Sequence, residues 1–137
     1  MPLGHLGVNV ADLAAAKAYY DRLMPAVEFE PFLEHHDEFA YRPAGGKPGT
    51  YLFFYPASAT GAAAAGYSRG ASGLQHLAFM VRTRGHVHAV HELVRELGST
   101  VLHAPREFPE YDSPYYATFW VDPHGFMLEA VCHHDRD

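Results

Sequence analysis

Residues 114–132 read PYYATFWVDPHGFMLEAVC. The β-branched and aromatic run at 115–121 and the apolar run at 126–132 predict two strands, and the Asp-Pro-His-Gly sequence between them predicts a tight turn. Glu129 interrupts the second strand, because an ionisable carboxylate stands where the pattern requires a core side chain. A carboxylate buried there is costly unless it is paired, protonated or bound to a metal ion. The sequence therefore predicts a partner for Glu129 elsewhere in the chain.

The order of predicted elements occurs twice. Module one (residues 3–55) contains a strand, a helix and three strands, and module two (residues 74–132) repeats this βαβββ order. The linker between them, residues 56–73, is rich in Gly, Ala and Ser, and it allows a short helical turn at Ala62–Ala65. The pattern predicts a single domain of the α+β class, residues 1–137.

The boundaries of the elements follow from apolar periodicity and from turn residues. Helices are expected from Asp12, a candidate N-cap, to Pro25, and over residues 84–97. Residues 105–114, which are rich in Pro, Glu and Tyr, are expected to form a loop. Strands are expected at 3–10, 27–32, 38–42, 50–55, 74–81, 100–103, 115–121 and 126–132.

The repeat extends to the residues themselves. The segment HLGVNV at residues 5–10 aligns with HLAFMV at residues 76–81, so each module opens with a histidine. Two matched histidines are much harder to obtain by chance than one. Without the match, each histidine would be assigned a structural or surface role. His5 and His76 are therefore the predicted partners of Glu129.

These three residues suit a divalent metal ion. If the modules share a cleft, His5, His76 and Glu129 occupy one face of the ion and leave its other positions open for substrate or water. Two imidazoles and a carboxylate suit Fe(II) and also Mn(II), Zn(II) or Ni(II). Because alternate strand residues share a face, Asn9 is expected beside His5, and Met80 beside His76, in the same cleft.

Neighbouring residues would complete such a cleft. Gly7 and Ala78 are small and would leave room for a ligand above the metal ion. His103 is expected either to contact the metal ligands or the substrate, or to have no role in the site. Tyr115 is expected either to line the pocket or to pack within its strand. For Glu129 considered alone, an ion pair with Arg106 is the alternative to metal binding.

Composition and charge exclude several classes of function. The net charge of −6, with only 10 Lys and Arg, leaves no basic surface for nucleic acid or for an anionic membrane. No apolar run approaches the ~20 residues of a membrane-spanning helix, and no signal peptide is expected. The single cysteine, Cys132, excludes an intrachain disulfide and fits a cytoplasmic protein. A small molecule is the expected partner.

The chain resembles the vicinal oxygen chelate superfamily. The resemblance lies in the βαβββ repeat, the histidine that opens each module and the glutamate of DPHGFMLE, and it covers the chain apart from residues 56–73. This superfamily includes glyoxalase I, bleomycin-resistance proteins, fosfomycin-resistance enzymes, methylmalonyl-CoA epimerase and extradiol ring-cleaving dioxygenases. The resemblance implies paired modules with curved mixed sheets around a metal-containing cleft. It also implies that one divalent metal ion is bound by His5, His76 and Glu129.

The resemblance further implies a homodimer, in which modules can be exchanged between chains, and a metal-dependent enzyme. Its substrate would be a small oxygen-chelating molecule, and its reaction that of a lyase or isomerase, with Glu129 as catalytic base, or that of a ring-cleaving dioxygenase. The alternative is a metal-free protein that binds a drug or another small molecule, as bleomycin-resistance proteins do. The presence of all three ligand residues favours the enzyme.

Three positions depart from the family pattern. One is Gly7, where fosfomycin-resistance enzymes have a threonine two positions after the first histidine. Glyoxalase I has a fourth metal ligand on the last strand of its first module. Alignment of GTYLF (residues 49–53) with GFMLE (residues 125–129) places Phe53 at this position in the present chain. Ring-cleaving dioxygenases and fosfomycin-resistance enzymes have a functional tyrosine ten positions before the glutamate, where this chain has Phe119. Tyr115 is the nearby alternative source of a phenol. The residues expected to bind substrate are therefore Asn9, Phe53, Met80, His103, Tyr115 and Phe119.

Overall fold

The computed structural model describes residues 3–58, 67–134 and 137. The helical turn expected at Ala62–Ala65 lies outside these ranges. Within them, no helix is both long enough and apolar enough to cross a membrane.

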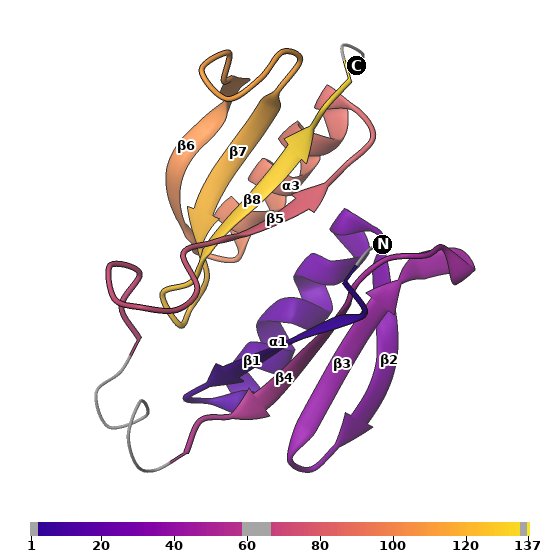
Figure 1. Ribbon diagram of the computed structural model, residues 1–137, viewed down its shortest axis with the longest axis vertical. Helices are drawn as coiled ribbons and strands as arrows, with labels where there is room; N and C mark the ends of the chain where they lie inside the picture. Colours follow the sequence, from indigo (N-terminus) through magenta and orange to yellow (C-terminus); the bar gives the residue numbers. More distant parts are fainter. Residues whose placement is uncertain (1–2, 59–66, 135–136) are drawn as a thin grey trace. The chain divides into compact units, whose positions relative to one another are not determined.

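The described chain is an α+β fold with two four-stranded mixed sheets, each accompanied by a helix (Figure 1). It divides into two compact units, Met1–Tyr67 and Ser68–Asp137. Each unit follows the βαβββ order that the sequence repeat predicts.

The sheet of the first unit has the strand order β1-β4-β3-β2. β1 is parallel to its neighbour β4, and the other neighbours are antiparallel. The elements are β1 (His5–Val10), α1 (Leu13–Leu23), the 3₁₀ turn η1 (Met24–Val27), β2 (Phe29–His35), β3 (Glu38–Pro43), the 3₁₀ turn η2 (Ala44–Gly46) and β4 (Tyr51–Pro56).

α1 covers one face of this sheet (Figure 1). Its N-terminus is capped by Asp12, whose carboxylate accepts a hydrogen bond from the backbone N–H of Ala15 (3.0 Å). Tyr20 is fully buried, and its ring centroid lies 4.4 Å from that of Phe54 on β4. Because side chains alternate along a strand, Phe53 points to the opposite, helix-free face of the sheet.

The second unit repeats this topology with the strand order β5-β8-β7-β6, and β5 is parallel to β8. Its N-cap, Thr83, accepts a hydrogen bond from the backbone N–H of His86 (3.1 Å). The buried face of the helix consists of three valines at helical spacing, Val87, Val90 and Val94. The elements are β5 (Leu77–Met80), α3 (Arg84–Glu96), β6 (Thr100–Glu107), β7 (Tyr116–Val121) and β8 (Met127–Cys132).

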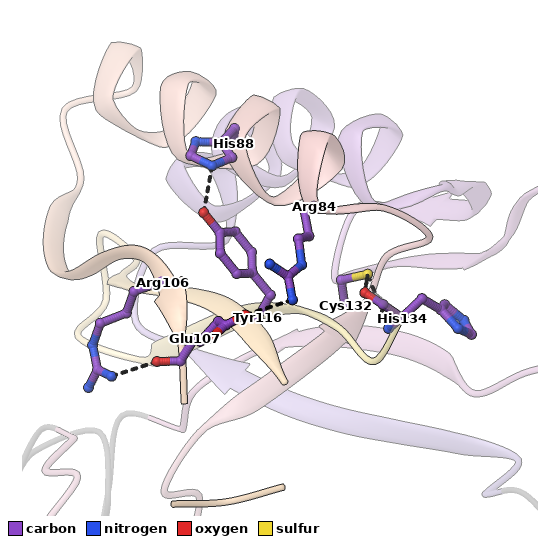
Figure 2. A network of polar contacts seen from close by, with 7 residues as sticks. All are labelled: Arg84, His88, Arg106, Glu107, Tyr116, Cys132 and His134. Carbon is purple, nitrogen blue, oxygen red and sulfur yellow. Dashed lines mark hydrogen bonds and ion pairs between the residues drawn. The ribbon is translucent and has the colours of Figure 1, made fainter. Parts of the chain in front are cut away.

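Contacts with α3 identify the two faces of this sheet. The hydroxyl of Tyr116 is hydrogen-bonded to Nε2 of His88 on α3 (2.8 Å), so Tyr116 points toward the helix (Figure 2). By alternation along β7, Phe119 points the other way. Glu129 is the cross-strand partner of Phe119, and it therefore lies on the helix-free face.

The strand register confirms the alignment of the two modules. Gly7 pairs with Phe53 across β1 and β4, and Ala78 pairs with Glu129 across β5 and β8. Phe53 and Glu129 therefore occupy equivalent positions, as the repeat predicts.

Three strands differ from their expected boundaries by three residues or more. The strand expected at 27–32 is shifted to 29–35, because residues 24–27 form a 3₁₀ turn that ends at Glu28 in the left-handed region (φ 62°). The strand expected at 74–81 begins only at Leu77, so His76 immediately precedes it. The strand expected at 100–103 continues to Glu107 through Pro105. Proline is tolerated there because β6 is an edge strand of the sheet.

Candidate functional site

Glu129 is a fully buried carboxylate in the centre of β8. Phe119 of β7 is its cross-strand partner on one side, and Ala78 of β5 on the other. A side chain at the middle of a central strand has little freedom to reach solvent. Its two oxygens must therefore find partners within the protein.

The two carboxylate oxygens have different surroundings. The phenol of Tyr115 donates a hydrogen bond to Oε2 at 2.5 Å. Oε1 lies 3.3 Å from Nε2 of His76, without the alignment of a hydrogen bond, and it has no hydrogen-bond partner among the described residues. Arg106 is the alternative partner that the sequence allowed. Its guanidinium instead lies 3.7 Å from the carboxylate of Glu110.

His76 presents one ring nitrogen to this carboxylate because its other nitrogen is engaged. Nδ1 of His76 is 2.6 Å from the side-chain oxygen of Gln75. A carbonyl oxygen can only accept, so Nδ1 carries the proton in this contact. Nε2 then has a lone pair available for a metal ion. Gln75 could not be identified from the sequence, because strict strand alternation would turn it away from His76, whereas β5 begins only at Leu77.

The electrostatics around Glu129 disfavour an isolated anion. Burial raises the pKa of the Glu129 carboxyl above its ordinary value of 4.5, and this effect outweighs the Tyr115 hydrogen bond and the nearby His76 and His133, which lower it. Burial, together with the Glu129 carboxylate, also raises the pKa of Tyr115. The carboxylate is therefore short of positive charge in this arrangement.

Aromatic rings surround the carboxylate on the helix-free face. Phe119 is buried, and its ring centroid lies 6.3 Å from that of His76 and 5.6 Å from that of His103. The ring of His103 also meets Phe108 edge-on at 5.6 Å. The second unit thus brings together four residues singled out from the sequence, His76, His103, Tyr115 and Phe119, around Glu129. Phe108 was not identified, since it falls in the expected loop.

The first unit places His5 against an aromatic ring rather than a carboxylate. His5 and Phe53 meet edge-on with 5.2 Å between ring centroids. The space beside Gly7, expected to be free for a ligand, is taken by Tyr55, whose ring carbon lies 3.1 Å from where a Cβ would stand. Asn9 is exposed on the same strand.

Met80, at the end of β5, is 74% exposed. Its side chain therefore contributes little to the core of the second unit. The exposure leaves it available for contact with another molecule or surface.

The donor atoms of the second unit fit a metal ion. Two ligand atoms that each lie about 2.0–2.2 Å from one metal ion are roughly 3.0–3.4 Å apart when they occupy adjacent positions. The 3.3 Å between His76 Nε2 and Glu129 Oε1 falls in this range. No group of three His, Cys, Asp or Glu side chains that could hold a metal ion is found among the described residues. A third protein ligand would have to come from elsewhere.

Comparisons with known proteins concern the family and the fold of the chain. The sequence model of the Glyoxalase/Bleomycin resistance protein/Dioxygenase superfamily matches residues 3–130. None of the curated proteins compared with the chain is a match.

Solved structures share the fold. A candidate glyoxalase from Bacillus halodurans is 26% identical, with a TM-score of 0.81 over 95% of this chain and 94% of that one. A glyoxalase/bleomycin resistance protein/dioxygenase family enzyme from Burkholderia phytofirmans is 17% identical, with a TM-score of 0.73 over 98% of this chain and 100% of that one. A lactoylglutathione lyase from Agrobacterium tumefaciens is 19% identical, with a TM-score of 0.64 over 95% of this chain and 92% of that one.

Proposed function

The chain belongs to the Glyoxalase/Bleomycin resistance protein/Dioxygenase superfamily, and from this premise we propose that it is a metal-dependent enzyme that acts on a small oxygen-chelating molecule. One observation carries the proposal. Glu129 is fully buried, and its Oε1 lacks a hydrogen-bond partner among the described residues while facing Nε2 of His76 at 3.3 Å. A buried carboxylate oxygen in this state calls for a cation.

The proposed ligands are His76, Glu129 and His5. The first two already face each other in the second unit. His5 opens the equivalent strand of the first unit and is the third imidazole or carboxylate ligand that the repeat supplies. The ion, which can be Fe, Mn, Zn or Ni, would act as a Lewis acid toward an oxygen of the substrate.

The other residues of the second unit prepare the site for a small substrate. Phe119, the cross-strand partner of Glu129, is buried, and its ring centroid lies 5.3 Å from that of Phe108. Glu129 is also the proposed catalytic base, a role that it would take if Oε1 left the metal ion and accepted a proton. Two reaction classes are compatible with this arrangement, a lyase or isomerase that moves a proton and a ring-cleaving dioxygenase.

Elemental analysis of untagged protein tests the proposal. Wild type is expected to contain about one divalent metal ion per chain, and His76→Ala and Glu129→Ala are expected to lose it. His36→Ala is the matched control, because the side chain of His36 is 95% exposed. If wild type neither contains metal nor takes it up, the enzyme proposal fails and a metal-free small-molecule-binding protein replaces it.

His5 is tested by mixing two inactive variants. His5→Ala and Glu129→Ala are each expected to lack the metal site. If His5 and Glu129 of one site come from different chains, mixed dimers of the two variants recover one intact site. If both come from the same chain, the mixture stays empty. His5→Ala protein that keeps wild-type metal affinity would remove His5 from the ligand set.

The metal identity then selects the substrates. An iron requirement with consumption of O₂ on catechols would assign ring cleavage. Turnover with nickel or zinc on a thiol adduct would assign the lyase class.

A further inference from the structure

We propose that Tyr115 is a positioning residue that makes Glu129 a one-oxygen ligand. Its phenol holds Oε2, and this leaves Oε1, the oxygen that faces His76, as the atom that binds the metal ion. This inference rests on the proposed function. It assigns to Tyr115 a role through Glu129, whereas the sequence suggested a substrate-binding wall of the pocket, a source of a phenol, or packing within the strand.

The first observation is the contact itself. A phenol and a carboxylate oxygen at 2.5 Å form a short hydrogen bond of the charge-assisted kind, which is among the stronger ones in proteins. A carboxylate otherwise offers two equivalent oxygens and can bind a metal ion through one or both. With Oε2 engaged, the two oxygens of Glu129 are no longer equivalent.

The second observation is that the Tyr115 ring is restrained. It meets the ring of Tyr111 edge-on at 5.4 Å, that of Phe108 at 6.2 Å and that of His133 at 5.1 Å. The carbonyl of Tyr115 accepts a hydrogen bond from the backbone N–H of Phe108 (2.8 Å). Backbone and ring are thus both held, and the phenol is pre-arranged to meet Glu129.

The third observation is the contrast with the adjacent tyrosine. Tyr116 also uses its hydroxyl in a hydrogen bond, but to His88 of α3 on the other side of the sheet (Figure 2). The guanidinium of Arg84 lies over the Tyr116 ring, 4.7 Å from its centroid. The two neighbouring phenols therefore serve different faces. Tyr116 provides a control in which a phenol is lost far from the carboxylate.

The test compares Tyr115→Phe with Tyr116→Phe in the full-length protein. Each variant keeps its ring and loses one hydroxyl. Metal affinity is measured by competition with a chelator, and the visible absorption of the cobalt(II)-loaded protein reports the ligand arrangement. Circular dichroism and thermal unfolding establish that both variants are folded.

Tyr115→Phe is expected to weaken metal binding by about 10–100-fold, the usual effect of losing a group that orients a metal ligand. It is also expected to shift the cobalt bands, because the second carboxylate oxygen becomes free to bind. Tyr116→Phe should leave affinity and spectrum unchanged. A purely structural role for Tyr115 would lower the unfolding temperature without moving the cobalt bands.

The outcomes separate this inference from the proposed function. If wild type binds metal and Tyr115→Phe has the same affinity and spectrum, the inference is wrong and the proposed function stands. If both tyrosine variants lose affinity equally, the inference is also overturned. If wild type binds no metal, the proposed function fails and the inference fails with it.

Discussion

Phe53 and Glu129 occupy the same register position in the two units of the chain. Phe53 lies opposite Gly7 in the parallel pair β1-β4, and Glu129 lies opposite Ala78 in the parallel pair β5-β8. One unit thus sets a histidine against a phenyl ring, and the other sets a histidine beside a carboxylate. The repeat therefore supplies two imidazoles but only one carboxylate.

Changing Phe53 to glutamate should make stability depend on metal. Phe53→Glu removes the ring contacts with His5 and Tyr55 and is expected to cost the metal-free protein about 1–3 kcal/mol. If the new carboxylate becomes a fourth ligand, added metal stabilises this variant more than it stabilises Phe53→Gln. Thermal unfolding with and without metal measures both the cost of the substitution and the stabilisation by added metal. Equal metal effects in the two variants would show that position 53 does not reach the ion.

Glu129 should give the metal-free protein a distinctive pH dependence. Its pKa is raised in the folded state, so the protonated form is favoured there. Protonated Glu129 therefore stabilises the folded protein. This stabilisation is fully present below pH 4.5, the ordinary pKa of the carboxyl, and it is lost as pH rises through the higher pKa of the folded state. Wild type should therefore lose stability relative to Glu129→Gln as pH rises above 4.5. Denaturant unfolding in chelator across this range measures the difference, and parallel curves would contradict the prediction.

Gln75 should matter to metal binding without touching the metal ion. Gln75→Ala removes the acceptor for Nδ1 of His76 and is expected to lower metal affinity about 10–100-fold. Gln75→Glu keeps an acceptor and should retain most of the affinity. Titration with a chelator compares the variants. The same affinity in Gln75→Ala as in wild type would mean that His76 is oriented by other contacts.

The cap of α3 should contribute to the stability of the second unit. Thr83→Ala removes the hydrogen bond to the backbone N–H of His86 and is expected to cost about 1 kcal/mol. Thr83→Asp, which can cap as well, should cost much less. Denaturant unfolding measures the change. Because the cap lies on the α3 side of the sheet, metal affinity should be unchanged in both variants.

Local patterns were sufficient to predict the fold and the proximity of one pair of side chains. The βαβββ repeat and the two-residue periodicity of strands are encoded in neighbouring residues, so the register that equates Phe53 with Glu129 could be predicted. The approach of His76 to Glu129 followed from the same repeat. The end of β6 could not be predicted, because Pro105 normally argues against a strand and only the edge position of β6 permits it.

The orientation of groups outside regular strands could not be predicted either. Gln75 lies two residues before β5 and Tyr115 one residue before β7, where alternation no longer fixes the direction of a side chain. Their partners depend on backbone turns set by distant contacts, such as the bond from the Phe108 N–H to the Tyr115 carbonyl. The sequence therefore suggested a phenol near the site without indicating its partner.

The parallel pairing of β5 with β8 affects how the site is made. In the order of synthesis β8 follows every other strand of its unit, yet in the sheet it lies between β5 and β7. Until β8 joins, β5 has no neighbour within its sheet, and the phenol of Tyr115 lacks its acceptor. Closing this non-local pairing is the slow kind of step in folding. A nascent chain thus acquires its last sheet contacts and its buried carboxylate together, and a polypeptide truncated before β8 would have neither.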